Sequence, residues 1–384
     1  MSTTFPTRRE LQSPLRYVDW FLPVLAIAIS VFGIFMNYSA TWRFLEFNGD
    51  DPYTFARRQT IFVLVGIAAM FVASIVDYRL IRDFAGQLYL FGLALLVLVL
   101  FIGKEVAGAK AWFQLPGFQL QPSEFAKLAS IAALAAFAAR QRSGMNLAGV
   151  LNGLVMMLIP MALVFQGGDL GTMLVYIAIT MAVLTAAASK VRHVAALALL
   201  GSLAIVMVFT ADEVLGVELL NDRQDERLTA FLDQESDVTD SNYNLQQSQI
   251  ALGSGGLTGR GYLQGSQTNL NLIPAQETDF IFTAAGEELG FLFGSLPLLA
   301  AYFFLMWRVL RAAQLAADRF GTYVCVGVLA MLLFQIFQNM GMTMGIMPIA
   351  GIPLPFMSHG GSSIITAFIA VGLVINIRSR RFSV

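Results

Sequence analysis

Phe84-Ala-Gly-Gln-Leu-Tyr-Leu-Phe-Gly-Leu-Ala-Leu-Leu-Val-Leu-Val-Leu-Phe-Ile102 is a stretch of sequence without a single charged side chain. An apolar helix of about 20 residues is long enough to cross the hydrocarbon core of a bilayer. Similar runs recur along the whole chain, at residues 18–40, 59–77, 84–102, 123–140, 147–165, 170–188, 194–210, 281–306, 322–343 and 361–377. The sequence therefore predicts an all-α polytopic membrane protein with about ten transmembrane helices.

The composition places the chain in the same class. Hydrophobic residues make up 57% of the 384 residues and charged residues only 13%, and the mean hydropathy is +0.68. The one cysteine, Cys325, lies in an apolar run, so neither a disulfide framework nor a cysteine-rich metal site is available. We expect no cleavable signal peptide, because the first apolar run is long enough to continue as a span.

The basic residues predict the orientation of the spans. With the N-terminus in the cytoplasm, most of the 24 Lys and Arg fall on the inner side, mainly in short loops, as the positive-inside rule requires. They are Arg8, Arg9, Arg16, Arg79, Arg82, Arg140, Arg142, Lys190, Arg192, Arg308, Arg311, Arg319, Arg378, Arg380 and Arg381. We expect one transmembrane domain over residues 1–384, with both termini inside, cytoplasmic tails at 1–17 and 378–384, and a large extracytoplasmic loop at 211–280 between the seventh and eighth spans.

This long external loop has two distinct parts. Residues 212–240 are strongly acidic, and Leu228, Phe231 and Leu232 have the spacing of a short amphipathic surface helix. The second part, Gly253-Ser-Gly-Gly-Leu-Thr-Gly-Arg-Gly261, neither follows a strand nor opens a Rossmann helix, which argues against dinucleotide binding. We interpret it as a turn-rich loop that can move over a cavity.

Four carboxylates follow, at Glu277, Asp279, Glu287 and Glu288, where the loop enters the next apolar run. Acids at membrane depth are costly and usually face a polar cavity or a partner. Asp279 lies near the predicted outer boundary, where a carboxylate meets the head group of a lipid-borne substrate. The alternative for Asp279 is a helix N-cap, and for Glu287 and Glu288 we expect pairing with a neighbouring helix.

A second polar motif, Gln121-Pro-Ser-Glu-Phe-Ala-Lys127, opens the fourth span. Proline is tolerated at a helix start, and Glu124 and Lys127 are spaced i, i+3, so they can pair on one helix face. The pair is either a purely structural intramembrane salt bridge or a source of positive potential for a cavity that handles diphosphate.

Further polar residues are predicted at the outer side. Arg58 and Lys110 are basic groups suited to phosphate, and Trp112 either stacks on a sugar or anchors the chain at the membrane interface. Near the C-terminus, Gln338-Asn339 precedes Pro348-Ile-Ala-Gly-Ile-Pro-Leu-Pro-Phe-Met-Ser-His-Gly-Gly-Ser-Ser363. Its prolines and glycines predict a non-helical, re-entrant segment, which must be buried in protein or line water. We expect this segment to form a wall beside Asp279.

Taken together, these motifs resemble the SEDS family (shape, elongation, division and sporulation proteins), and within it most closely the RodA branch of cell elongation. The resemblance extends over nearly the whole chain. Its motifs are Arg58-Gln59, Gln121-Pro-Ser-Glu-Phe-Ala-Lys127, Gln166 with Asp169-Leu-Gly-Thr172, the Gly253 loop, Thr278-Asp-Phe-Ile-Phe282, Gly286-Glu-Glu-Leu-Gly290, Gln338-Asn339 and Gly351-Ile-Pro-Leu-Pro-Phe356.

The resemblance implies ten transmembrane helices and a peptidoglycan glycosyltransferase that polymerises lipid II at the outer face of the bacterial cell membrane. The essential aspartate of the family falls on Asp279, which acts as the base for the attacking hydroxyl in an inverting single displacement that releases undecaprenyl diphosphate. Residues assigned to the lipid II head group and diphosphate are Arg58, Lys110, Trp112, Glu124, Lys127, Gln338, Asn339, Ser358 and Ser362. A bridging divalent cation, Mg²⁺ or Mn²⁺, stays an open alternative, although the sequence shows no carboxylate cluster at metal spacing.

Four positions depart from the family pattern. Ala111 stands where many members have Arg, Gly168 and Gln234 replace prolines, and His359 stands where Tyr is common. None of them touches the Asp279 motif, whose Thr278 resembles the elongation proteins, whereas division relatives more often carry Asn.

The resemblance also implies partners. They are a single-span class B penicillin-binding protein held by the eighth and ninth spans and other proteins of the elongation machinery; no nucleic acid is expected. Three alternatives stay open: a transporter that flips lipid II, a scaffold for a bound enzyme, and a division or sporulation paralogue.

Overall fold

The computed structural model describes residues 19–382, except 107, 116–117, 142–143, 189, 191, 196–198, 200 and 202–239. Its helices are α1 (Phe21–Asn48), α2 (Thr54–Ile75), α3 (Tyr78–Asp83), α4 (Ala85–Ile102), α5 (Pro122–Ala139), α6 (Leu147–Gln166), α7 (Leu170–Ala187), α10 (Asp240–Gly255), α11 (Ser266–Asn269), α12 (Ile281–Gly290), the π-helical η3 (Phe291–Ser295), α13 (Leu296–Gln314), α14 (Arg319–Thr343) and α15 (Gly361–Ser379). Its strands are β1 (Lys104–Val106), β2 (Ala109–Leu115) and β3 (Phe118–Leu120).

Within these described residues, eight helical segments are long and apolar enough to cross a membrane. They are α1, α2, α4, α6, α7, α14, α15 and the continuous stretch Ile281–Gln314. The span expected at 123–140 is also a helix, α5, but Pro122, Ser123, Glu124 and Lys127 lower its hydropathy. The span expected at 194–210 and the surface helix expected at Leu228–Leu232 lie largely or wholly outside the described residues, so a total of about ten spans stays a prediction.

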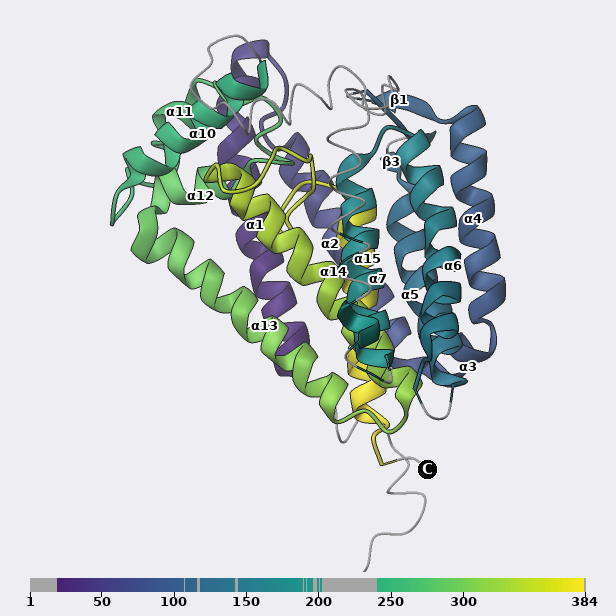
Figure 1. Ribbon diagram of the computed structural model, residues 1–384. Coiled ribbons are helices and arrows are strands. Elements are labelled where there is room, and N and C mark those ends of the chain that lie inside the picture. Colours follow the sequence, from purple (N-terminus) through teal and green to yellow (C-terminus); the bar gives the residue numbers. More distant parts are fainter. Residues whose placement is uncertain are drawn as a thin grey trace, which may run out of the picture.

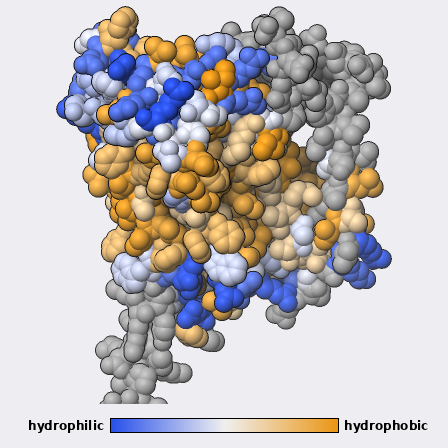
Figure 2. Space-filling model, turned by 90° about the vertical axis from the view of Figure 1, so that its left-hand side faces the viewer, coloured by the Kyte–Doolittle hydropathy of each residue, from blue (hydrophilic) through white to orange (hydrophobic). Residues whose placement is uncertain are grey.

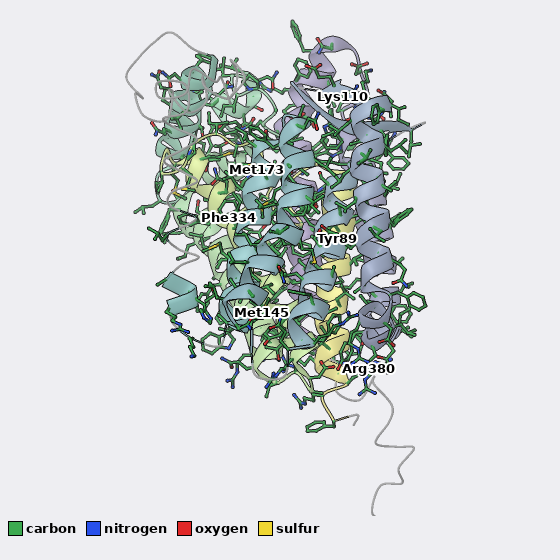
Figure 3. The ribbon with its side chains drawn as sticks, turned by 45° about the vertical axis from the view of Figure 1, so that its right-hand side comes forward. Tyr89, Lys110, Met145, Met173, Phe334 and Arg380 are labelled. Carbon is green, nitrogen blue, oxygen red and sulfur yellow. The ribbon has the colours of Figure 1, made fainter. Side chains whose placement is uncertain are left out.

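The long helices form a bundle whose two ends differ in character (Figure 1). Strands β1–β3 and helices α10 and α11 lie at one end, and α3 and the C-terminus lie at the other. Lys110 and Arg380 mark these two ends in Figure 3. On the face drawn in Figure 2, a hydrophobic band separates the two hydrophilic ends, as expected for a membrane-spanning bundle. Below, the end with Lys110 is called the outer end and the end with Arg380 the inner end, following the predicted orientation.

The centre of the bundle is built from α5, α14 and α15, whose residues are largely buried. Small residues bring these helices close to their neighbours. A Cβ added to Gly327 of α14 would lie 2.7 Å from Ile131 Cγ2 of α5, and one added to Gly372 of α15 would lie 2.4 Å from the carbonyl of Met70 in α2. Close approach through small residues is the usual way in which membrane helices gain packing energy.

The segment between α4 and α5 forms a small antiparallel sheet in the order β1-β2-β3, which the all-α prediction does not contain. Lys104 of β1 faces Trp112 of β2, and Phe113 of β2 faces Leu120 of β3. The sheet is anchored to the bundle because the Lys110 N–H donates to the Gly167 carbonyl at the end of α6, at 2.8 Å. Such non-helical backbone needs partners in the protein at this depth.

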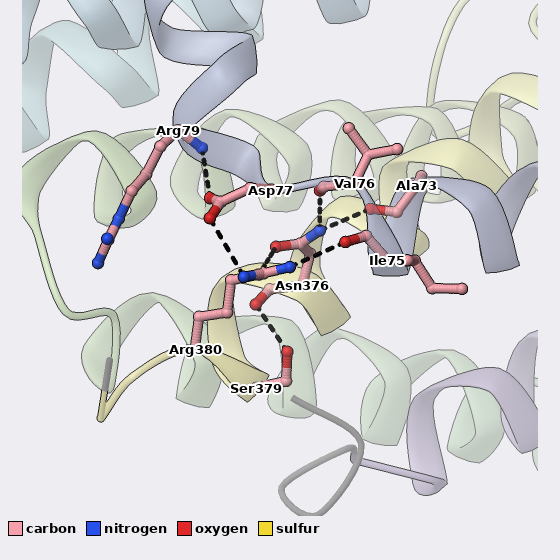
Figure 4. Close-up of polar contacts among 8 residues, drawn as sticks. All are labelled: Ala73, Ile75, Val76, Asp77, Arg79, Asn376, Ser379 and Arg380. Carbon is pink, nitrogen blue, oxygen red and sulfur yellow. Dashed lines mark hydrogen bonds and ion pairs between the residues drawn. The ribbon is translucent and has the colours of Figure 1, made fainter. Parts of the chain in front are cut away.

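Charged groups fasten the helices together at the inner end. Arg308 of α13 binds the buried Asp19 through Nη2 and Oδ1 at 2.6 Å, and Arg378 of α15 binds the other oxygen of Asp19. Figure 4 shows the second cluster, in which Arg380 pairs with Asp77 at 3.1 Å and donates to the Ile75 carbonyl. Asn376 also donates to the carbonyls of Ala73 and Val76, which satisfies the end of α2.

The helix that begins at Ile281 is interrupted at Gly290 (φ +72°), and the glycine-rich segment repairs the interruption. The Arg260 N–H donates to the Glu287 carbonyl at 3.1 Å, and the Phe291 N–H donates to the Gly256 carbonyl at 2.9 Å. Backbone groups freed from the helix therefore find partners, as membrane depth demands. The interpretation of residues 253–261 as a turn-rich loop is wrong for residues 253–255, which belong to α10, and confirmed for the turn that follows them. The backbone of residues 256–261 is hydrogen-bonded to residues 287–292, and movement of this segment over a cavity stays a prediction.

This docking predicts a sharp difference between two glycines of α10. A Cβ at Gly255 would lie 2.0 Å from the Gly286 carbonyl oxygen, whereas one at Gly253 would have nothing within 4 Å. Gly255→Ala should therefore destabilise the protein by about 1–3 kcal/mol, which is a loss of roughly 2–10 °C in Tm. Gly253→Ala is the matched control and should leave Tm unchanged or raise it. Equal Tm values for the two variants in detergent would show that the glycine-rich segment does not pack as described.

Candidate functional site

Asp279 lies in a turn at the outer end, immediately before α12. The N–H groups of Thr278 and Asp279 both donate to the Ala275 carbonyl, at 3.2 and 3.0 Å, and Ala275 itself has a positive φ of 53°. Helix α12 has Phe280 at its cap position and receives no side-chain capping hydrogen bond. The N-cap interpretation of Asp279 is therefore wrong, because the cap position of α12 is Phe280, and the half-buried Asp279 precedes it in the turn.

The non-helical segment predicted near the C-terminus is present between α14 and α15, and its residues 352 and 354–358 are buried. Side-chain amides from three spans satisfy its backbone. Asn37 of α1 donates to the Met357 carbonyl at 2.9 Å, Gln59 of α2 to the Ser358 carbonyl at 3.1 Å, and Gln338 of α14 to the Pro348 carbonyl at 2.7 Å. The segment is thus buried in protein, as its prolines and glycines predicted.

Asn339 joins this segment to the turn that carries Asp279. Its Nδ2 donates both to the Asp279 carbonyl at 2.7 Å and to the Ile352 carbonyl at 2.8 Å. A second link is the His359 N–H, which donates to the Glu277 carbonyl at 2.8 Å. The expectation that the re-entrant segment lies beside Asp279 is confirmed by these contacts.

Arg58 is exposed on α2, and its positive charge influences the pKa of His359. Burial, and then the positive charge of Arg58, lowers the pKa of His359 to about 4, so the imidazole is neutral at neutral pH. The His359 ring lies against Phe55 and Phe62, with ring centroids 5.0 and 6.0 Å away. Burial also raises the pKa of the nearby Glu277. His359 and Glu277 therefore border the Asp279 turn, and the exposed cation of Arg58 lies near His359.

Glu124 and Lys127 form the predicted ion pair on α5. The Lys127 Nζ lies 2.7 Å from Glu124 Oε1, and the two side chains are only 1% and 3% exposed. Any effect of Lys127 on an anionic substrate must therefore act through its field at a distance, because its three donors are enclosed.

The sheet residues occupy a different part of the outer end. The Lys110 Nζ donates to the Phe101 carbonyl at 3.3 Å, and Lys110 lines a small pocket with Ser123 and Asp169. Asp169 caps α7 by accepting from the Thr172 N–H and also accepts from the Gln121 side chain, both at 2.9 Å. Lys110 and Trp112 thus belong to the side of the molecule formed by α4, α6 and β2.

Three more of the predicted substrate-binding residues have structural partners. Gln338 holds Pro348, as described above. The Ser358 hydroxyl accepts from the Leu354 N–H at 2.8 Å, and the Ser362 hydroxyl accepts from the Gln121 N–H at 2.9 Å. Their side chains therefore position backbone. Sequence reasoning gave Asn37 no role and Gln59 none beyond its motif, although an amide in an apolar span is itself a signal for a buried polar contact.

The two adjacent glutamates of α12 have separate partners. Glu288 accepts from the Ser39 hydroxyl of α1 at 2.5 Å, so the expected pairing with a neighbouring helix is confirmed for this residue. Glu287 accepts from the N–H groups of Gln267 and Thr268 on the short helix α11, at 2.8 and 3.0 Å, so the expectation is confirmed for Glu287 as well. Both side chains are completely buried.

Gly168, one of the departures from the expected motif, has a backbone that proline cannot adopt. Its φ is +82°, and a Cβ there would lie 2.8 Å from the Gly108 carbonyl oxygen. Proline fixes φ near −65°. The glycine therefore allows the turn between α6 and α7 to lie directly against the loop between β1 and β2. Gln234, another departure, lies outside the described residues.

The fold and this site define a class: a multi-pass membrane protein with a carboxylate turn and a buried re-entrant segment at one end of the bundle. The sequence profile of the FtsW/RodA/SpoVE family of cell cycle proteins matches residues 19–382. The chain belongs to this family, the SEDS family, and is therefore a multi-pass protein of the bacterial inner membrane.

Curated relatives come from several branches of the family. A probable peptidoglycan glycosyltransferase FtsW of Trichlorobacter lovleyi is 36% identical over 96% of this chain and 95% of its own length. Stage V sporulation protein E of Bacillus subtilis is 34% identical over 94% and 96%. The peptidoglycan glycosyltransferase MrdB of Escherichia coli is 36% identical over 83% and 84%. The narrower resemblance to the RodA branch is therefore not supported over the division branch.

Solved structures share the fold. A chain of a peptidoglycan synthase complex, studied for its coordination of polymerisation and crosslinking, is 29% identical with a TM-score of 0.78. It covers 96% of this chain and 99% of its own. The rod shape determining protein RodA of Thermus thermophilus is 27% identical with a TM-score of 0.69, over 96% and 98%.

Proposed function

We propose that this protein is a peptidoglycan glycosyltransferase that joins lipid II units into glycan strands and releases undecaprenyl diphosphate. The observation that carries the proposal is the Asp279 turn. It presents a half-buried carboxylate at the outer end and is held from α14 by the 2.7 Å bond of Asn339. The relatives named peptidoglycan glycosyltransferases support the same reaction class.

Asp279 acts as the base that removes the proton from the attacking sugar hydroxyl, a role worth typically 10²–10⁴-fold in rate. Diphosphate is already a good leaving group, so the displacement does not need the second, acidic carboxyl group that glycosidases use. Inversion at the anomeric carbon follows from a single displacement. The remaining requirement is positive charge near the departing diphosphate.

Arg58 is suited to supply that charge at short range. It is exposed at the outer end of α2, and in the described part of the chain it forms no ion pair. A guanidinium fork binds phosphate oxygens in pairs. Lys127 acts through the dipole of its buried pair with Glu124, and Lys110 and Trp112 contact a more distant part of the substrate.

A divalent cation would have to be shared with the substrate. Among the described residues, no three His, Cys, Asp or Glu side chains lie close enough together to hold a metal ion by themselves. Asp279 together with the diphosphate oxygens of lipid II would complete such a site, with Mg²⁺ or Mn²⁺ neutralising the leaving group.

The partner is a class B penicillin-binding protein, docked through its membrane helix on α13 and α14, with other proteins of the same machinery. Both helices expose large apolar side chains: Phe303 (60%), Phe304 (49%) and Trp307 (50%) on α13, and Leu333 (52%) and Phe337 (56%) on α14. A solved structure similar to this chain belongs to a peptidoglycan synthase complex, which supports an assembly of this kind.

The cellular role that we propose is elongation and cell shape, on the ground of Thr278 next to Asp279. The FtsW and sporulation relatives favour division or sporulation with equal strength. Expression in strains depleted of either the elongation or the division protein separates these roles, because only the matching strain regains its shape or its septa.

Purified protein supplied with lipid II and the penicillin-binding partner should make glycan strands, which are visible as a ladder on gels. The competing function is a transporter that moves lipid II across the bilayer. Proteoliposomes loaded with labelled lipid II test it directly: movement without any polymer would refute the enzyme and establish the transporter. Polymer formed only by the partner would instead make this chain a scaffold.

A further inference from the structure

We propose that Glu287 is a positioning residue that fixes the Asp279 turn through a buried chain of hydrogen bonds; this inference rests on the proposed function. Glu287 is fully buried on α12, yet none of the described Lys or Arg side chains forms an ion pair with it. A buried carboxylate without a partner would be costly. Its partners must therefore be hydrogen-bond donors, and their identity reveals its role.

Four donors converge on the Glu287 carboxylate. They are the N–H groups of Gln267 and Thr268 at 2.8 and 3.0 Å, the Thr268 hydroxyl at 2.8 Å and the Ser266 hydroxyl at 3.3 Å. The Arg260 Nη1 in turn donates to the Ser266 hydroxyl at 2.9 Å, so this positive charge is linked to Glu287 through one hydroxyl. All four are donors, and the two oxygens of the Glu287 carboxyl group accept them. These bonds fix residues 266–268 against α12.

Thr268 links Glu287 to the Asp279 turn by hydrogen bonds. Its hydroxyl donates to Glu287 and accepts from the Gln276 Nε2 at 3.0 Å, and Gln276 also donates to the Thr283 hydroxyl at 3.2 Å. Thr268, Gln276 and Thr283 are all at most 2% exposed. Gln276 is the residue after Ala275, whose carbonyl closes the turn on the Asp279 N–H.

The turn is therefore held on two sides. Asn339 of α14 holds the Asp279 carbonyl, and the chain Glu287–Thr268–Gln276 of buried side chains holds the start of the turn. A misplacement of about 1 Å in a reacting group can cost about 10²-fold in rate. Glu287 acts in this way on the position of the Asp279 carboxylate, without contact to the substrate.

Glu287→Gln tests the proposal, because it keeps the size of the side chain but replaces one acceptor oxygen with a donor. We expect kcat for lipid II polymerisation to fall about 10- to 100-fold while KM stays within about twofold. Glu288→Gln is the matched control: it is the adjacent residue with the same burial, but it accepts from Ser39 of α1 and lies beside the backbone of Leu263 and Gly265 rather than Thr268. Its kcat should stay at the wild-type value. A Glu287→Gln variant that folds and polymerises at the wild-type rate would overturn the proposal, as would equal losses in both variants.

Substitution of Thr268 provides a second test, in which the Glu287 side chain itself is unchanged. Thr268→Val removes the hydroxyl but keeps the shape of the side chain, and it should lower kcat. Thr268→Ser keeps the hydroxyl, and its kcat should be close to the wild-type value. Combined with Gln276→Ala, Thr268→Val should cause no further loss, because both act through one chain of bonds. Full additivity would contradict the proposal. If Asp279→Asn keeps wild-type activity, the proposed base is wrong; if it is inactive while Glu287→Gln and Thr268→Val are fully active, only this inference fails.

Discussion

Asp279→Ala and Asp279→Asn should abolish the polymerisation of lipid II, with a fall in rate of about 10²–10⁴-fold or more. Neither substitution leaves a group that can take the proton from the attacking hydroxyl. The fold should survive, because Asn339 holds the backbone carbonyl of residue 279 and the cap position of α12 is Phe280. The measurement is the initial rate of glycan formation by purified protein with its partner, together with Tm.

Glu105→Gln is the control for this experiment. Glu105 is an exposed acid on β1, at the same end of the molecule, and its loss should change neither rate nor Tm. An Asp279→Asn variant that polymerises lipid II at the wild-type rate would remove Asp279 from the chemistry. The fold, the family and the reaction class would then stand, but the base would have to be sought elsewhere in the same turn, first at Glu277.

Lys127→Met should unfold or severely destabilise the protein, by about 3–5 kcal/mol, because it leaves the Glu124 carboxylate buried without its partner charge. In the wild type, Glu124 Oε1 lies 2.7 Å from Lys127 Nζ, and both side chains are almost completely enclosed. The double variant Glu124→Gln with Lys127→Met removes both charges and should recover most of the lost Tm. Thermal unfolding in detergent measures this recovery.

The double variant also separates the two interpretations of the pair. If Lys127 supplies positive potential to the leaving diphosphate, the refolded double variant should polymerise at least about tenfold more slowly than wild type. Lys104→Met, which removes an exposed lysine at the same end, should cost nothing. A double variant with wild-type Tm and wild-type rate would show that the pair is purely structural.

Most of the fold could be predicted from the sequence, because the length of each apolar run determines whether it forms a membrane-spanning helix. A run such as residues 84–102 has few alternatives to a membrane helix, and the helix found there ends at Ile102 as expected. The sheet at β1–β3 was missed because its strands are short and lie in a segment without strong alternation. The interruption at Gly290 was missed because the apolar pattern continues through it, and only its partners in residues 256–261 make it possible.

The sequence could predict which residues belong to the site, but not which residues they contact. A carboxylate at a membrane boundary pointed to Asp279, and the spacing of Glu124 and Lys127 pointed to their pair. The partners of Asn339 and Glu287 could not be foreseen, because they lie 60 and about 20 positions away along the chain. Two adjacent acids such as Glu287 and Glu288 give no indication in the sequence that one binds α11 and the other binds α1.

The buried charges at the inner end determine where the bundle can fluctuate. Asp19 is held by Arg308 and Arg378, and stripping both from it would leave an isolated carboxylate, at a cost of about 3–5 kcal/mol. Such a separation is about 10²–10⁴-fold rarer than one without this cost. Thermal motion should therefore part α1, α13 and α15 mainly at the end where Asp279 lies. Exchange of the proposed lipid-borne substrate would then take place at the outer end, while the inner end stays closed.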